Sequence, residues 1–370
     1  MEKAEATATR GAREAGDREN EYPWLDRRTA VYAGVGAVVL ALGVAALIGE
    51  AADYGEIVDA VKRADKRWLP LCVAGQAAAY AGYVVAYRDF ARVDRGPELP
   101  LATAAKVVGI GFGAFVVGST PGGLAFDFWA LRRAGAETHE AVRRVLALNT
   151  FEWGVLGSFA TLSAAAVLLG RGKGAPLAMT LAWLVAVPVS VVLAAWVSSR
   201  RQAPRFVDFT RDEAGSKGVS RRGRAAAALR GALADAIGGL LVARALLSRP
   251  KRYLGGVLGY PLFWIGQLVT LYAAIQAFAG GPILPTPLVL AFASGYAATA
   301  LPLPVGGAGG IEAALTFSLH AVGVGLAPAL LAVLVYRLFT FWLPIVPALA
   351  LLPLARRLSD ELAAAPLATI

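Results

Sequence analysis

Two glycine-rich stretches of the chain each end in a carboxylate. The first, STPGGLAFD, covers 119–127, and the second, PVGGAGGIE, covers 304–312. Proline stops an incoming helix, and glycine permits the backbone angles of a sharp turn. Each stretch therefore predicts a turn followed by a new half-helix, which begins near Gly122 in the first stretch and near Gly307 in the second.

The start of such a half-helix is a site for an anion, because its first amide groups are unbonded and the helix dipole is positive there. A lipid phosphate is the expected ligand. The alternative is that the glycines only let helices pack closely, as small residues do in membranes. The predicted substrate-contacting residues are Thr120, Pro121, Gly122, Gly123, Asp127, Arg132, Arg133, Pro304, Gly306, Gly307, Gly309, Gly310 and Glu312.

Asp127 and Glu312 lie one to two turns into these half-helices. An acid near a helix start can simply complement the dipole and have no other role. At membrane depth, however, an unpaired carboxylate is unfavourable by several kcal/mol, so such a residue marks a site for a proton, a cation or a headgroup. The equivalent positions of the two acids favour the second interpretation.

Glu152 and Arg337 each lie near the middle of a long apolar segment, too far from either end for the charge to reach water. An ion pair would compensate both burials. We therefore predict that Glu152 and Arg337 form a buried ion pair.

The other polar residues suggest no catalytic machinery. Arg132 and Arg133 are expected at a cytosolic mouth, where they either bind phosphate or only set the topology. Cys72 is the single cysteine, the two histidines are isolated, and no catalytic triad, zinc spacing or nucleotide fingerprint is present. The sequence predicts a protein that is not an enzyme and has no cofactor or metal.

Two alternatives remain open. The first is a membrane enzyme that acts on a lipid-linked phosphate, with Asp127 or Glu312 as general base. The second is a scaffold without transport activity that binds partners through a basic loop.

The composition is that of a membrane protein. Of the 370 residues, 57% are hydrophobic and 17% are charged. Segments of about 20 apolar residues, the length that crosses a bilayer, recur along the chain and are clearest at 31–49 and 177–197. Residues 1–28 mix acids and bases and are predicted to be a disordered cytosolic tail.

Positive charge is concentrated in one segment. Between Ser198 and Arg252 there are thirteen Lys and Arg residues and four acids, within a net charge of +10 for the chain. The positive-inside rule places this loop in the cytoplasm. We expect it to attract anionic lipid headgroups and not nucleic acid. Its segment 224–247 is predicted to form a surface helix with snorkelling arginines.

These anchors predict an all-α polytopic protein with about six full spans and two re-entrant helical hairpins, which cover 101–133 and 285–325. The alternative, which the sequence leaves open, is that the hairpins cross the membrane fully. The first hairpin opens toward the cytoplasm and the second toward the outside. Both termini are expected in the cytoplasm. Residues 50–67 fall outside although they carry Lys62, Arg63, Lys66 and Arg67, contrary to the charge rule.

A weak internal repeat relates the two halves at an offset of 185 residues. It matches Arg67-Trp68-Leu69 with Arg252-Tyr253-Leu254, Pro100 with Pro285, Gly122 with Gly307, Asp127 with Glu312, and Glu152 with Arg337. Because the expected topology gives the halves opposite orientations, this is the inverted repeat of secondary transporters. The two hairpins would then meet near the membrane midplane.

The same residues resemble the transmembrane domain of lysylphosphatidylglycerol synthases and its stand-alone, flippase-like relatives. The resemblance is carried by LPLPVGGAGGIEAAL at 301–315, AVGV at 321–324 and ALLAVLVYRLFTFWLPIVPALALL at 329–352, and it extends from about 30 to 358. The family usually has a Gly-Glu pair where this chain has GGLAFD, and often an Arg at the position of Ile311. These differences concern the headgroup more than the fold.

The resemblance implies lipid translocation without lipid synthesis, since no soluble aminoacyl-transferase domain is expected in these 370 residues. The implied substrate is an anionic or isoprenoid-linked lipid that crosses between leaflets of the plasma membrane, and the implied partners are membrane lipids with anionic headgroups. The expected organisation is a flippase-like domain at 29–358, made of half one at 67–197, the basic loop at 198–251 and half two at 252–358, followed by a cytosolic tail at 359–370. The oligomeric state is left open.

Overall fold

A computed structural model describes most of the chain. It covers residues 54–171, 174–199, 221–279, 283–301, 307–351 and 354–368, together with four helical positions between Val35 and Ala46. Side chains at 54, 56, 116–121, 221–228, 349, 355 and 356 are outside the description. The predicted span at 31–49 therefore lies almost wholly outside the described residues, as does most of the basic loop.

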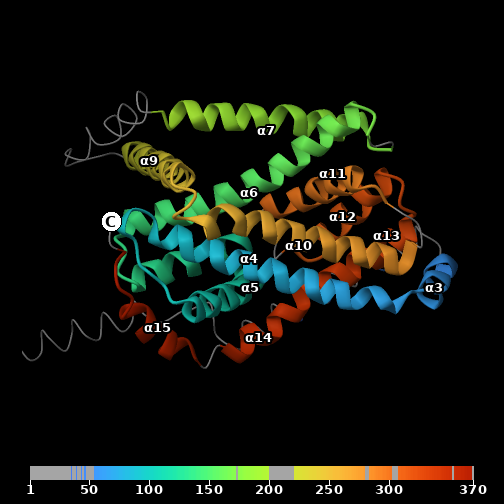
Figure 1. Ribbon diagram of the computed structural model, residues 1–370, viewed down its shortest axis with the longest axis horizontal. Helices are drawn as coiled ribbons and strands as arrows, with labels where there is room; N and C mark the ends of the chain where they lie inside the picture. Colours follow the sequence, from blue (N-terminus) through green and yellow to red (C-terminus); the bar gives the residue numbers. More distant parts are fainter. Residues whose placement is uncertain are drawn as a thin grey trace, which may run out of the picture.

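The described residues are almost entirely helical, which confirms the prediction of an all-α protein. Within them the only strand-like pairing is an isolated bridge between Pro97 and Leu367. The helices, shown in Figure 1, are α3 (Tyr54–Lys62), η1 (Lys66–Trp68), α4 (Leu69–Arg92), η2 (Val93–Arg95), α5 (Leu101–Arg133), α6 (Thr138–Leu168), α7 (Leu177–Val197), α9 (Arg221–Ser248), α10 (Leu254–Ala279), α11 (Pro285–Tyr296), η3 (Ala297–Ala300), α12 (Gly310–Ala321), α13 (Leu326–Arg337), the π-helical turn η5 (Leu338–Trp342), α14 (Leu343–Leu351) and α15 (Ala355–Ala363).

Six helical segments are long and apolar enough to cross a membrane, which confirms a multi-pass membrane protein. They are Lys66–Arg95, Thr138–Leu168, Leu177–Val197, Leu229–Ser248, Leu254–Phe278 and Leu326–Ala348. The set differs from the expected one at a single helix: it includes part of α9, which was expected to lie on the surface, and the segment 31–49 is not described.

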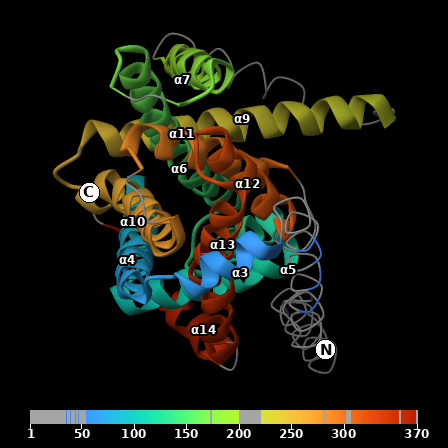
Figure 2. The same cartoon turned by 90° about the vertical axis from the view of Figure 1, so that its right-hand side faces the viewer.

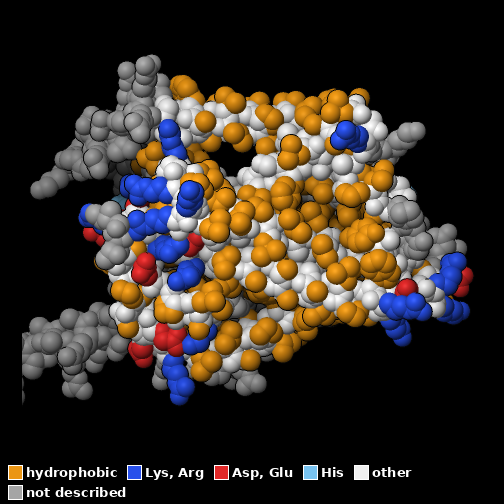
Figure 3. Space-filling view, viewed as in Figure 1, with side chains coloured by type: hydrophobic (Ala, Val, Ile, Leu, Met, Phe, Trp, Pro, Cys, Tyr) orange, Lys and Arg blue, Asp and Glu red, His pale blue; other side chains and the backbone are white. Residues whose placement is uncertain are grey.

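The orientation of α9 sets it apart from the other long helices. In Figure 1 α4, α7 and α10 run from side to side, while α9 is seen down its axis, and in Figure 2 α9 lies crosswise. Figure 3 shows a broad hydrophobic middle with charged side chains gathered at the two ends of the molecule. α9 lies at one charged end and α3 at the other. The length and composition of α9 therefore fit a membrane span, but its direction does not.

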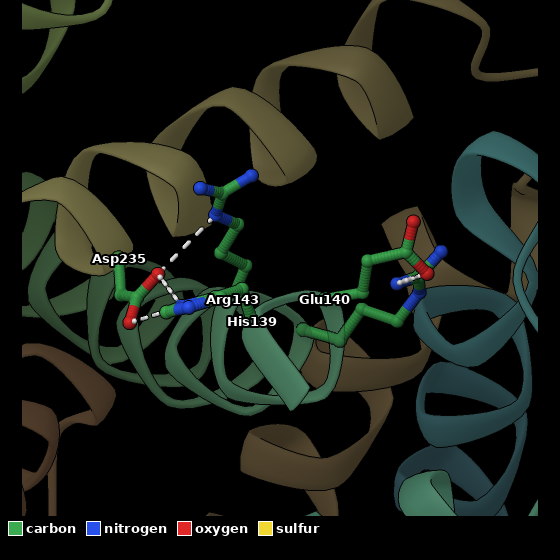
Figure 4. Close-up of polar contacts among 5 residues, drawn as sticks. His139, Glu140, Arg143 and Asp235 are labelled. Atoms are coloured by element: carbon green, nitrogen blue, oxygen red, sulfur yellow. Dashed lines mark hydrogen bonds and ion pairs between the residues drawn. The ribbon is translucent and has the colours of Figure 1, made fainter. Parts of the chain in front are cut away.

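α9 is tied to the start of α6 by polar contacts, which Figure 4 shows. The buried Asp235 carboxylate of α9 lies 3.4 Å from Arg143 Nε and 3.2 Å from His139 Nδ1, both on α6. The backbone of α9 also approaches α6 closely, since a Cβ at Gly239 would lie 3.1 Å from Leu146 Cβ. His139, which was expected to be isolated, therefore contacts Asp235 and helps to join α6 to α9.

The centre of the fold is the antiparallel pair of α4 and α10, which pack along most of their length. The seam is made of glycine: Gly82 faces the Gly259 carbonyl, and Gly75 faces Gly266 further along. Without side chains between them the two backbones come into direct contact. α4 begins at Leu69 and α10 at Leu254, so the two helices start at positions 185 residues apart.

Two helical hairpins pack beside this pair. In a straight helix eight residues rise by about 12 Å, yet a Cβ at Gly122 would lie 2.5 Å from the Ala114 carbonyl oxygen. α5 therefore doubles back between these residues, and its two arms form the α5 hairpin. α11 and α12 form the second, the α11–α12 hairpin, in which a Cβ at Gly295 would lie 2.6 Å from Leu315 Cα.

The hairpins open at opposite ends of α6. The α5 hairpin ends next to the first residue of α6, Thr138, with Ala136 N bonded to the Leu131 carbonyl. The α11–α12 hairpin begins beyond the last residue of α6, where Thr286 Oγ1 donates to the Arg171 carbonyl at 3.1 Å. The two turns therefore approach the middle of the molecule from opposite directions.

Replacing Gly82 by Ala tests the backbone seam. The added Cβ would meet the Gly259 carbonyl and, at 2.7 Å, the Phe263 amide nitrogen, and neither backbone atom can move aside independently of its helix. We expect Gly82→Ala to destabilise the fold by about 1–3 kcal/mol and to lower the melting temperature in detergent. Gly154→Ala is the matched control, because nothing lies within 4 Å of its added Cβ. Equal melting temperatures for the two variants would contradict the seam.

Candidate functional site

A cavity of about 320 Å³ lies where the two hairpin turns meet. The α5 hairpin contributes residues from both arms, and the second hairpin contributes the residues that follow α11. α4, α6 and α10 complete the wall. The lining residues are Tyr83, Val108, Gly111, Phe112, Phe115, Gly123, Leu124, Asp127, Asn149, Glu152, Trp153, Phe263, Tyr296, Thr299 and Ala300.

Two carboxylates face this cavity, Asp127 from the second arm of the α5 hairpin and Glu152 from α6. Asp127 is 8% exposed. Among the described residues neither acid has a hydrogen-bond or ion-pair partner, and no Lys or Arg lines the cavity. Aromatic side chains, among them Tyr83, Phe112 and Phe263, make up much of the rest of the lining. The cavity is therefore an acidic pocket with two unpaired carboxylates.

A smaller cavity of about 40 Å³ adjoins the first, since Phe112, Phe115, Phe263, Tyr296 and Thr299 line both. Its other walls come from α10 and from the segment of α13, η5 and α14. They are Gln267, Tyr336, Arg337, Thr340, Phe341 and Pro344. The pair of cavities thus presents acids on one side and an arginine on the other.

Arg337 is paired with Glu312. Its Nε donates to Glu312 Oε1 at 2.8 Å, and both side chains are at least 94% buried. The other carboxylate oxygen, Oε2, accepts the Gly309 amide at 2.6 Å. One carboxylate thus fixes the start of α12 to the end of α13. The guanidinium also stacks on the Phe341 ring, 4.1 Å from its centroid.

This geometry corrects the predicted pair of Glu152 with Arg337. Within the described part of the chain the ion pair of Arg337 is with Glu312, and none joins it to Glu152. The reason is local: Glu312 lies at the third position of α12 and caps its own helix start, which holds the carboxylate beside α13. Glu152 faces the larger cavity from α6.

The role expected for Glu312 is corrected as well. It lines neither cavity, because its two oxygens are bonded to Gly309 and Arg337. The other interpretation, in which Glu312 complements the dipole at the start of its own helix, agrees with its position at the third residue of α12. Gly307 and Gly309 have φ angles of 75° and 82°, where other residues are strained, so the turn before α12 does require glycine.

Of the remaining predicted site residues, some line the larger cavity, some lie elsewhere, and some are outside the described residues. Gly123 lines the larger cavity and Gly122 packs against Ala114 in the α5 hairpin. Gly310 starts α12. Pro304 and Gly306 lie outside the described residues, and so do the side chains of Thr120 and Pro121. The structure brings Asp127 together with Glu152, not with Glu312.

Arg132 and Arg133 lie away from both cavities, at the open end of the α5 hairpin. Arg132 donates to the Ala136 carbonyl at 2.7 Å, and Arg133 Nε donates to Ser359 Oγ of α15 at 2.7 Å. Lys106, on the other arm, pairs with Glu361 of α15. α15 therefore bridges the two arms through Lys106 and Arg133, while Arg132 is bonded within the end of the hairpin.

Sequence analysis missed several polar residues of the site. Asn149 lies three residues before Glu152, and Thr340 lies three residues after Arg337, about one helical turn in each case. A search for polar neighbours at helical spacing around each buried charge would have found both. Thr299 and Gln267 carry no such signal, because they come from segments distant in sequence.

The pairing of Glu312 with Arg337 is tested by a double-mutant cycle. Glu312→Gln leaves a buried, uncompensated guanidinium, so we expect it to destabilise the fold by about 3–5 kcal/mol. Adding Arg337→Gln should recover part of the loss. The comparison cycle uses Glu152→Gln with Arg337→Gln and should be additive. Thermal unfolding in detergent measures both cycles, and coupling confined to Glu152 would restore the original prediction.

The contact of α15 with the α5 hairpin should depend on pH. Hydrogen bonds from Lys106 and Thr103 lower the pKa of Glu361 below its ordinary value of 4.5. A lowered pKa means that the contact contributes stability above the ordinary value and loses it as the pH falls through the lowered value. We expect amide hydrogen exchange in 355–368 to rise under acid, and Glu361→Gln to raise it at neutral pH. Unchanged exchange in that variant would contradict the contact.

Comparison with known proteins supplies the last observation on the site. No curated protein matches the chain. A family model described as the lysylphosphatidylglycerol synthase TM region matches residues 34–348. The match covers both hairpins, both cavities and the Glu312 to Arg337 contact, and it confirms the resemblance seen in the sequence. The chain belongs to the lysylphosphatidylglycerol synthase TM region family.

Proposed function

We propose that the protein moves a lipid headgroup between the two leaflets of the membrane through the larger cavity. The observation that carries this proposal is the cavity itself: two unpaired carboxylates face a space of about 320 Å³ in the apolar middle of the molecule. Such groups are unfavourable at membrane depth unless a ligand, a proton or water meets them. Family membership supports a role connected with membrane lipids.

The hairpins supply the route. In this proposal both are re-entrant and dip from opposite leaflets, which is supported by their openings at opposite ends of α6. The inverted repeat is supported by α4 and α10, which start 185 residues apart and pack antiparallel. Backbone that turns at membrane depth is tolerated where it lines a polar cavity. The headgroup passes between the turns while the acyl chains stay in the bilayer.

The charges of the cavity define the roles of its residues. Asp127 and Glu152 carry a proton or a cationic substituent of the headgroup, since no basic side chain of the described residues neutralises them. The substrate is an anionic or isoprenoid-linked lipid, as the sequence suggests, so its negative charge must lie away from these acids. No covalent chemistry is part of the proposal.

The orientation follows from the basic segments. We place α9 along the cytoplasmic surface of the plasma membrane, with both termini on the same side. Its crosswise direction supports this placement (Figure 2), and so do the charged side chains gathered at that end (Figure 3). α3 then lies at the outer surface.

Reconstituted vesicles test the proposal. Wild-type protein should accelerate the loss of a fluorescent anionic phospholipid from the inner leaflet, measured with a quencher that does not cross the membrane. Asp127→Asn and Glu152→Gln should each lower the rate about tenfold, the equivalent of roughly 1.4 kcal/mol. Asp59→Asn is the control, because Asp59 lies exposed on α3, away from both cavities.

The proposal fails if wild-type protein accelerates no anionic lipid, or if the three variants are equally active. Mass spectrometry of the recovered lipid separates transport from catalysis. A covalent change of lipid mass that depends on Asp127 would replace the transporter by an enzyme.

A further inference from the structure

The guanidinium of Arg337 is only partly satisfied. Its Nε is bonded to Glu312, but Nη2 is buried without a hydrogen-bond partner among the described residues. The hydroxyl of Thr340 is also buried: it lies beside the Tyr336 hydroxyl and meets the geometric criterion for a hydrogen bond with no described residue. Both residues line the smaller cavity. Buried donors that lack partners are rare in native structures, and a functional role is one of the explanations for them.

The surroundings hold this edge of Arg337 in place. Glu312 fixes Nε on one side, and the Phe341 ring supports the guanidinium plane from below at 4.1 Å. On the facing wall the Tyr336 hydroxyl donates to Gln267 Oε1 at 2.8 Å, so the side-chain oxygen of that glutamine already has a hydrogen-bond partner. A planar, fixed pair of N–H groups matches two oxygens of a phosphate or carboxylate.

The chemistry of the walls selects the ligand. Arg337 offers only donors and Thr340 can donate, so the ligand must accept hydrogen bonds. The hydroxyl of Thr299, which also lines this cavity, already donates to the Tyr296 carbonyl at 2.8 Å. Glu312 neutralises the charge of Arg337, and two further acids face the adjoining cavity. A singly charged oxyanion is therefore favoured over a dianion.

We propose that Arg337 and Thr340 form a subsite for the phosphodiester group of the lipid. The inference rests on the proposed function and assigns the negative charge of the headgroup to the smaller cavity. The rest of the headgroup occupies the larger cavity, which shares five lining residues with the smaller one. The subsite thus holds the phosphodiester away from Asp127 and Glu152.

Thr340→Val tests the subsite, because valine keeps the volume and removes the hydroxyl. Thr316→Val is the matched control: the Thr316 hydroxyl is also buried without a partner among the described residues, yet it lines neither cavity. Arg337→Lys is the second variant, since lysine keeps a charge for Glu312 and loses the planar edge.

The measurement is retention of phosphatidylglycerol by full-length protein in neutral nanodiscs, detected by native mass spectrometry. We expect retention to fall about fivefold in Thr340→Val and further in Arg337→Lys, and to stay unchanged in Thr316→Val. A neutral glycolipid without phosphate should be retained equally by all four proteins. Wild-type retention of phosphatidylglycerol in Thr340→Val and Arg337→Lys would overturn the subsite, and so would an equal loss of the glycolipid.

Two further measurements distinguish a failure of the subsite from a failure of the proposed function. Inorganic phosphate should not displace the lipid, and full displacement would show a free-phosphate site in place of a lipid subsite. Translocation is measured in parallel. Intact translocation with unchanged retention in Thr340→Val overturns the subsite and leaves the proposed function standing. Retention that falls as expected while wild-type protein translocates nothing supports the subsite and overturns the proposed function.

Discussion

The carboxylate of Glu312 is the interaction on which the site depends. It accepts the Gly309 amide with one oxygen and Arg337 Nε with the other, and so it fastens the turn of the α11–α12 hairpin to α13. A free carboxylate and a free guanidinium in this setting would each be unfavourable by several kcal/mol. Joined, they are neutral and rigid. The turn is therefore held in one place although its glycines would permit many conformations.

The arrangement leaves the two cavities with distinct electrostatic characters. Because Glu312 is used internally, the unpaired negative charge of the interior comes from Asp127 and Glu152, which lie on the other side of the shared aromatic wall. Arg337 lines the smaller cavity, and its Nη2 has no hydrogen-bond partner among the described residues. Because Glu312 is paired with Arg337, the larger cavity suits a positive charge and the smaller cavity suits an oxyanion.

Much of the fold could be predicted because its causes are local. Apolar length predicts the spans, glycine and proline predict the turns, and the concentration of arginine predicts which end α9 occupies. The partner of Arg337 could not be predicted in this way. Glu152 was predicted from the sequence as that partner, whereas the pairing with Glu312 depends on how α12 lies against α13, a contact between residues 25 positions apart.

The same limit applies to the cavity residues. Asp127 was identified by its place after a glycine turn, but its neighbour Glu152 comes from another helix, and Thr299 from the second hairpin. Their proximity depends on the tertiary packing around the α4 and α10 pair. The α5 hairpin shows the reverse case: α5 doubles back between Ala114 and Gly122, close to the Pro121 and Gly122 turn that the local sequence indicates.

The glycine seam between α4 and α10 has a mechanical consequence. Where carbonyls and glycines of two helices are in direct contact, a shift of either helix by a single residue would drive a side chain into the opposing backbone. Sliding of the two halves along this seam is thereby prevented. In the proposed transport function, a change between inward-facing and outward-facing states would therefore come from tilting of the hairpins against this fixed pair of helices.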